Sequence, residues 1–227
     1  MRIISDTKLI NRNRKIGQFS AIASLIIFAV GFYFSFQPEQ FNLSLIALLF
    51  GVIISQVSIY FGNRWGRSPR PDEWITRGLK GLGDNYSLYH YNTPVPHLLI
   101  GPAGIWIFLP YYQGGVVQYL DGKWKQKKVN PILRLFAQES LGRPDLDAKA
   151  LIDDLQKKLA KALPGVEIPP IHAACVFTNP KVSLEVVDAP VPCLTIEKLK
   201  DFIRRQAKEK PISMDQVYTI QSVLPAG

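Results

Sequence analysis

The sequence predicts an α/β protein: an N-terminal transmembrane helical hairpin, followed by a mixed-sheet domain with flanking helices. Three observations support this fold class. Two long apolar runs without charge lie near the N-terminus, strand-length apolar runs follow in the middle of the chain, and amphipathic helical patterns occur toward its C-terminus. The 227 residues suffice for one globular domain and an appendage. Helices that flank a central sheet are one of the stable layer arrangements of such a domain.

The two apolar runs occupy residues 17–36 and 41–62, and neither contains a charged side chain. Each is long enough to cross a hydrocarbon core of roughly 30 Å as a helix. Residues 37–40 between them are too few to hold a domain, so both flanks are expected on the same side of the membrane. A cleaved signal peptide is disfavoured because a second span follows at once. A buried helix pair of a soluble protein is disfavoured because both runs are apolar on all faces.

Basic residues flank the two spans, whereas Glu39 is the charged residue between them. They are Arg2, Lys8, Arg12, Arg14 and Lys15 before the first span, and Arg64, Arg67, Arg70 and Arg77 after the second. Since Arg and Lys close to span ends favour the cytoplasm, we expect a multi-pass protein of the cell membrane with both termini cytoplasmic. Cys175 and Cys193 lack CxxC spacing, which suits a reducing compartment.

These patterns divide the chain into a membrane anchor at 1–62, a basic linker at 63–71 and a cytoplasmic domain at 72–227. Trp65, in the linker, is expected at the membrane interface, where an amphipathic ring is favoured. The lipid bilayer is therefore an expected partner. The formal net charge of the chain is +9, and a basic excess suits anionic lipid headgroups as well as it suits nucleic acid.

The sequence pattern of the first part of the domain predicts a helix that is followed by strands. Residues 72–82 show a helical stripe, and Asp72 and Glu73 lie in the first turn, where the helix dipole favours acids. Three strands are expected, at 86–92, 98–101 and 105–109. Residues 102–104 join the last two as a hairpin. The continuous apolar character of these runs suits strands that are covered on both faces.

The sequence pattern of the second part of the domain predicts another hairpin, which is followed by helices and strands. Asp121-Gly122 lies at the centre of 116–129, and both residues accept the positive φ of a tight hairpin turn. Leucines at four-residue spacing predict a helix at 147–163. The later elements are strands at 173–179 and 193–195, a helix at 196–209 with Thr195 as its candidate N-cap, and a last short helix. Ser213 and Gln216 have capping-box spacing before that helix.

The segment HLLIGPAGIWIFL at 97–109 carries a motif of the form His-hydrophobic-Gly-Pro-x-Gly-hydrophobic. Its matching residues are His97, Gly101, Pro102 and Gly104. Other matches are Gly114 or Gly115, the hairpin with Trp124, Asn130-Pro131, the helix at 147–163 and the VFTN strand. From Glu73 to about Leu224, two-thirds of the chain, the sequence thus resembles the nuclease-related domain (NERD) family. The resemblance implies a restriction-endonuclease-like domain with a PD-(D/E)XK nuclease core.

The departures from the family pattern fall on the residues that would carry catalysis. The family signature implies an Asp before His97, a Glu after the second apolar run and a Lys two residues later. This chain has Pro96, Leu109 and Tyr111 at those positions, and only Glu73 remains of the acidic set. Metal-dependent phosphodiester cleavage needs carboxylates that converge on a divalent ion, and one carboxylate cannot hold Mg²⁺ by itself. We therefore expect no catalytic residue, no metal and no cofactor.

One cluster combines basic and aromatic residues: Lys123, Lys125, Lys127 and Lys128, with Trp124 among them. Strand alternation places the first three lysines on one face and Trp124 on the other. Such a face could contact phosphates of nucleic acid or of lipid. The alternative is a solvated hairpin edge that its lysines protect against aggregation.

The remaining polar candidates suggest no catalytic site. His90, His97 and His172 show no metal-ligand spacing and are expected to be ordinary structural histidines. Cys175 lies in an apolar strand, where a buried and inert thiol is expected.

The leading hypothesis is a membrane-anchored, catalytically degenerate nuclease-related domain that acts in binding or scaffolding, with nucleic acid or a protein as its partner. Two alternatives remain open. The first is an active metal-dependent nuclease that needs Mg²⁺ and uses a displaced acid set, Glu73 with Asp84 or Asp121. The second is a structural membrane protein in which the helical hairpin is the working part.

Overall fold

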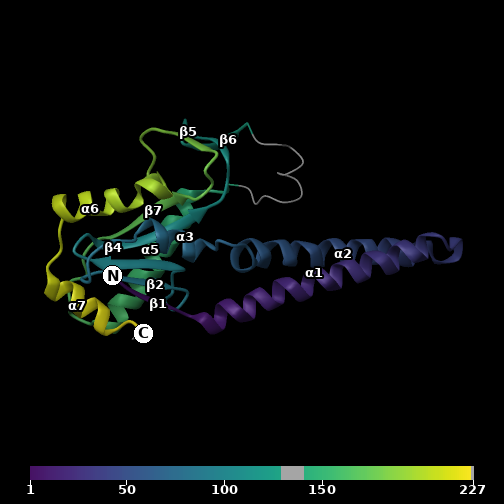
Figure 1. Ribbon diagram of the computed structural model, residues 1–227, viewed down its shortest axis with the longest axis horizontal. Coiled ribbons are helices and arrows are strands. Elements are labelled where there is room, and N and C mark those ends of the chain that lie inside the picture. The colour runs from purple at the N-terminus through teal and green to yellow at the C-terminus, as the bar shows by residue number, and fades with distance from the viewer. Residues whose placement is uncertain (129–140, 226–227) are drawn as a thin grey trace. The chain divides into compact units, whose positions relative to one another are not determined.

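A computed structural model describes residues 1–128 and 141–225 of the chain. It consists of two compact units (Figure 1). One unit is Thr7–Arg70, and the other combines Met1–Asp6 with Pro71–Gly227. The sequence pattern alone assigns residues 1–6 to the anchor, whereas the structure groups them with the sheet. Asn130-Pro131, which contributes to the NERD resemblance, lies outside the described residues.

The first unit is the expected helical hairpin. It contains α1 (Thr7–Ser35), the 3₁₀ turn η1 (Pro38–Gln40), α2 (Phe41–Phe61) and the π-helical turn η2 (Gly62–Gly66). Both long helices qualify as candidate membrane spans, and only 17% and 11% of their apolar windows are buried. Large apolar side chains such as Phe19 and Leu25 are more than two-thirds exposed, at 69% and 68%. Helices of a soluble core would bury these side chains, so the hairpin suits membrane association.

Small residues line the contact between α1 and α2 at seven-residue spacing. Gly17, Ser24 and Gly31 are buried on α1, and Ser44 and Gly51 are buried on α2. A Cβ atom on Gly31 would lie 3.0 Å from the Cβ of Ala47, and one on Gly51 would lie 2.6 Å from the ring of Phe28. The Ser58 hydroxyl donates to the Gly17 carbonyl at 3.1 Å. Membrane helices commonly pack through such small residues, because they let the two backbones approach closely.

The second unit is built on a mixed six-stranded sheet in the order β1-β2-β3-β4-β7-β9. The strands are β1 (Arg2–Ser5), β2 (Ser87–His90), β3 (His97–Gly101), β4 (Gly104–Tyr111), β7 (Ile171–Phe177) and β9 (Cys193–Thr195). The pairs β2–β3 and β3–β4 are antiparallel, whereas β1–β2, β4–β7 and β7–β9 are parallel. The mixed sheet predicted from the apolar runs is confirmed, and β4 extends two residues beyond the expected end, to Tyr111.

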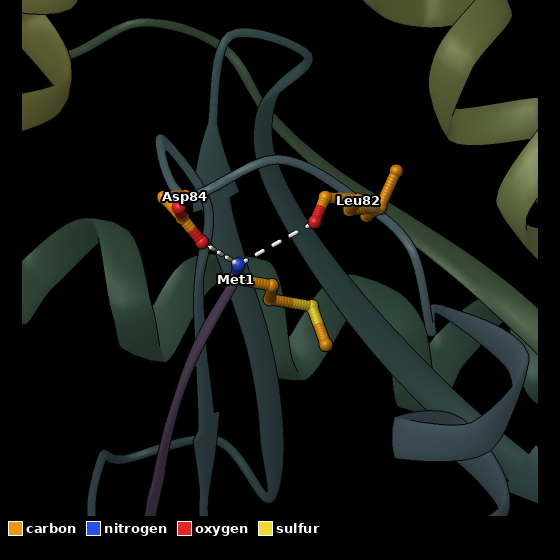
Figure 2. A network of polar contacts seen from close by, with 3 residues as sticks. All are labelled: Met1, Leu82 and Asp84. Carbon is orange, nitrogen blue, oxygen red and sulfur yellow. Dashed lines mark hydrogen bonds and ion pairs between the residues drawn. The ribbon is translucent and has the colours of Figure 1, made fainter.

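Strand β1 is one of the elements that the sequence analysis did not predict. Arg2–Ser5 pairs in parallel with Ser87–His90 at the edge of the sheet. The Met1 ammonium lies 2.9 Å from Asp84 Oδ1 and 3.4 Å from the Leu82 carbonyl oxygen (Figure 2). In the sequence, the four residues Arg2–Ser5 precede a long apolar segment, and they are therefore interpreted as a flank of that segment. Its partner strand lies more than eighty residues away, so only the fold identifies it.

Helices cover both faces of the large sheet. On one face, α3 (Pro71–Gly78), the turn η3 (Ile196–Lys198) and α6 (Leu199–Glu209) pack on Leu88, Leu99 and Phe108. On the other face, α5 (Pro144–Ala162) and α7 (Met214–Ser222) pack on Leu98, Ile107 and Cys175. The alternation of strand side chains therefore yields two separate apolar cores. The expected flanking helices are confirmed.

The helix termini are only partly as expected. Ser213 and Gln216 form a complete capping box at the start of α7. Thr195, however, makes no side-chain cap hydrogen bond, because the chain enters the 3₁₀ turn η3 first and α6 begins only at Leu199. The expected N-cap role of Thr195 is wrong for this reason.

A second, three-stranded sheet has the order β6-β5-β8. It consists of β5 (Gly115–Leu120), β6 (Lys123–Lys127) and β8 (Val182–Val186). The Asp121-Gly122 turn is confirmed, with φ values of 52° and 72°. Gly115 has a φ of 79°, and a Cβ atom there would clash with the Lys127 carbonyl oxygen, so this position requires glycine. Strand β8 was not predicted, since its partner β5 lies far away in the sequence.

Candidate functional site

The ends of β3 and β4 are the place where the family resemblance implies acids and a lysine. Leu109 is 7% exposed and belongs to the core that α5 covers. Tyr111 lies on the same face two residues later, and its ring stacks on Phe177 with 5.4 Å between the centroids. Pro96 precedes β3, and its carbonyl accepts a hydrogen bond from the Tyr91 amide at 2.9 Å. Apolar packing thus occupies the end of β4, whereas Pro96 before β3 is exposed.

The hydroxyl of Tyr111 lies in a low-polarity environment next to α5. Burial is the main cause that raises the pKa of Tyr111, and the neighbouring Cys175 and Asp147 raise it further. A neutral phenol of this kind cannot supply the positive charge that a lysine would bring to a scissile phosphate.

The acidic residues of the displaced-acid alternative lie in different parts of the fold. Glu73 is on α3, Asp84 follows that helix and pairs with the Met1 ammonium, and Asp121 is in the β5–β6 turn. That ammonium lowers the pKa of Asp84 through a hydrogen bond and its charge. Within residues 1–128 and 141–225, no three His, Cys, Asp or Glu side chains form a group that could hold a metal ion. The alternative gains no support from these positions.

The structure brings two of the three histidines together. His90 Nδ1 lies 2.9 Å from His97 Nδ1, and His90 Nε2 lies 3.0 Å from the Thr76 hydroxyl. Both rings are 1% exposed. Burial lowers the pKa of His97 well below its usual value, and the charge of His90 lowers it further. The pair links β2, β3 and α3, and sequence spacing missed it because it arises from the antiparallel register His90↔His97.

The third histidine lies apart from this pair. His172 stacks on Trp106 with 4.9 Å between the ring centroids. Burial lowers the pKa of His172, and Lys210 adds to this effect. The stacked ring fits the structural role expected for His172.

The lysines of β6 form an exposed row on the small sheet. Lys123, Lys125 and Lys127 are exposed, and the intervening Trp124 and Gln126 are half-buried. This is the expected alternation. At about 3.4 Å per residue, neighbouring lysines of the row are about 6.8 Å apart along the strand. Lys128 follows the strand with a positive φ of 55°, so it lies outside the regular alternation.

Residues on the opposite face of β6 hold the lysine row in place. The Trp124 indole donates to Asp145 Oδ1 at 2.9 Å, and its ring lies 4.9 Å from that of Tyr119. The Gln126 amide donates to the Gly114 carbonyl at 2.8 Å. The hairpin is therefore attached to the rest of the domain through one face, and the lysine face stays open to solvent.

Neighbouring strands complete the lysine face. In register with the lysines lie Val116, Gln118 and Leu120 of β5, and Ser183 and Glu185 of β8. Glu185 is the acid on this face, and the Gln118 side chain donates a hydrogen bond to it. Both aromatic rings of the hairpin, Tyr119 and Trp124, belong to the opposite face. The lysine face can therefore contact phosphates, but among the described residues it offers no ring on which a base could stack.

Comparisons of the chain with protein-family models, with curated proteins and with solved structures find no match.

Proposed function

We propose that this chain is a membrane-anchored protein of the nuclease-related type, with a restriction-endonuclease-like sheet, that binds nucleic acid without cleaving it. The observation that carries the proposal is the solvent-exposed row of Lys123, Lys125 and Lys127 on a strand that is anchored through its other face. Lysines attract the phosphate backbone irrespective of sequence. Binding through this face is therefore expected to discriminate little between base sequences.

The absence of catalysis is supported by the packing at the ends of β3 and β4. Leu109 is part of the apolar core, and the Tyr111 ring stacks on Phe177. Neither side chain can bind a metal ion in the manner of a carboxylate. Glu73 alone would leave a divalent ion without the further oxygen ligands that it needs.

We further infer that both termini lie in the cytoplasm. Basic residues flank the hairpin on both sides, whereas the short connection carries only Glu39. The pairing of β1 with β2 supports placing both flanks on one side of the membrane, because the segments before α1 and after α2 belong to one folded unit. The proposed nucleic-acid ligand would accordingly be met in the cytoplasm.

A salt titration of nucleic-acid binding tests the proposal. The full chain, reconstituted in nanodiscs of zwitterionic lipid, is mixed with a fluorescein-labelled single-stranded oligonucleotide, and affinity is measured by fluorescence anisotropy. The logarithm of the affinity should fall with the logarithm of salt by about 0.7 for each phosphate contact. The triple variant Lys123→Gln, Lys125→Gln, Lys127→Gln should lower this slope by about 0.7 for each lysine that contacts a phosphate.

A matched variant distinguishes binding by the lysine face from a general effect of the protein's net charge. Lys157, Lys158 and Lys161 are exposed on α5. Their triple replacement by glutamine removes the same charge from a different element and should leave most of the slope intact. Equal losses in both triple variants, or no loss in either, would contradict the assignment of binding to β6.

A further inference from the structure

The two cysteines of the chain are direct neighbours in the large sheet. Cys175 of β7 and Cys193 of β9 are partners in a parallel register. The Cys175 amide donates to the Pro192 carbonyl at 2.9 Å, which fixes this register next to Cys193. Both side chains contribute to the core that α5 covers, and both thiols are free. Eighteen positions separate the two residues in sequence, and the fold places them side by side.

The two thiols differ in accessibility. Cys175 is fully buried, at 0% exposed, whereas Cys193 is partly exposed on the edge strand β9. The Cys193 thiol lies 3.6 Å from the Val191 carbonyl oxygen. A hydrogen bond with Cys193, followed by burial, raises the pKa of Cys175. A reagent from solution would therefore reach Cys193 first.

The pair lies in register with Leu109, the position at which the family resemblance implies a catalytic acid. Leu109 of β4 is the register partner of Cys175, and Cys175 is in turn the partner of Cys193. Tyr111 and Asp147 complete the surroundings of the two thiols. Adjacent strands lie about 4.8 Å apart, which is within the range of about 4.4–6.8 Å that separates the Cα atoms of disulfides.

We propose that Cys175 and Cys193 form a redox-active dithiol, which a low-molecular-weight disulfide oxidises to a disulfide bond between β7 and β9. The Cys193 thiolate attacks one sulfur of the small disulfide, the S–S bond of that molecule breaks, and one thiolate leaves. The Cys175 thiolate then attacks the Cys193 sulfur, and the second thiolate leaves. The two protons of the cysteines pass to the departing thiolates, so that one small disulfide becomes two thiols.

The bond would close the chain between β7 and β9 into a loop that contains β8. Because β8 pairs with β5, this loop carries one edge of the small sheet whose other edge is the lysine strand β6. In a reducing compartment a disulfide of this kind is transient, which is the usual behaviour of cytosolic redox-sensing pairs.

Mass spectrometry of the full chain tests this proposal. The chain is purified in detergent micelles, freed of reductant, incubated with glutathione disulfide and then alkylated with N-ethylmaleimide in denaturant. The expected product has lost two hydrogens, takes up no maleimide and yields a peptide linked between Cys175 and Cys193. A chain that keeps a glutathione adduct on Cys193, forms disulfide-linked dimers or retains two alkylatable thiols would overturn the proposal.

Single substitutions test the order of the two steps. In Cys175→Ala, the second step is blocked, so the glutathione adduct on Cys193 should accumulate and persist. In Cys193→Ala, the buried Cys175 should stay unmodified while the chain is folded. Absence of the adduct in the folded Cys175→Ala chain would show that Cys193 is not the attacking thiol, and would contradict the mechanism.

Discussion

At the ends of β3 and β4, a few side chains decide which chemistry the sheet can support. Leu109 is buried in an apolar core, and the ring of Tyr111 two residues later stacks on Phe177. A charged group at either position would lose its hydration without a built partner. We therefore expect that an acid introduced at position 109 would lower stability before it affected any activity.

The substitution Leu109→Glu should destabilise the α/β domain by about 3–5 kcal/mol, because it buries an uncompensated charge. Leu109→Met keeps the volume and should cost less than about 1.5 kcal/mol. Thermal unfolding in micelles, followed by near-ultraviolet circular dichroism, measures both. A Leu109→Glu chain as stable as the wild type would show that position 109 is not part of a closed core.

The buried His90–His97 pair makes stability depend on pH. Burial, followed by the charge of His90, lowers the pKa of His97 well below the 6.5 of the unfolded chain, so the unfolded chain binds the proton more readily. The stability from neutral His97 is fully present above pH 6.5 and is lost as the pH falls toward the lower folded-state pKa.

Unfolding of the full chain in micelles over a pH series from neutral to acid measures this effect. In His97→Asn the loss of stability on acidification should be smaller than in the wild type. His172→Asn should change it less, because His172 is only partly buried. Parallel pH profiles for the wild type and His97→Asn would contradict the assignment to His97.

At the scale of elements, local patterns and long-range pairings differ in how far the sequence reveals them. The two apolar helices, the β3–β4 hairpin, the Asp121-Gly122 turn and α5 follow from composition and periodicity. So does the outward face of the β6 lysines. Register between strands does not follow from local pattern, whether the strands are distant in sequence or adjacent, as β2 and β3 are. For that reason β1, β8, the histidine pair and the thiol pair emerge only from the fold.

The packing of α1 on α2 provides a prediction for the hairpin. In Gly51→Leu, the new side chain would collide with the Phe28 ring, which a Cβ atom alone would approach to 2.6 Å. Overpacking of this kind typically costs about 1–3 kcal/mol. Val52→Leu, at an exposed neighbouring position, adds bulk toward lipid and should be neutral. Thermal stability in micelles compares the two, and equal stability would show that Gly51 does not lie in the helix contact.

At the scale of the whole molecule, β1 links the two ends of the hairpin to one folded unit. The chain leaves the sheet after Asp6, forms both long helices and returns to the same unit at Pro71. Truncation before residue 63 therefore removes an edge strand of the sheet together with the anchor.

This connectivity and the basic flanks of the hairpin together predict the topology in cells. In a chain with both native cysteines replaced by alanine, a cysteine introduced at Gln37 should react with a membrane-impermeant maleimide in intact cells. A cysteine introduced at the exposed Lys208 should react only after permeabilisation. Labelling of both positions in intact cells, or protection of position 37, would contradict the proposed orientation.

The proposed activity of the domain is to bind nucleic acid and leave it intact. It is tested by incubating the full chain in nanodiscs with end-labelled single-stranded DNA or RNA and Mg²⁺, followed by native and denaturing electrophoresis of the same samples. We expect a salt-sensitive mobility shift on the native gel and full-length strands on the denaturing gel. Shortened strands that require Mg²⁺ and disappear in Glu73→Gln would contradict the claim.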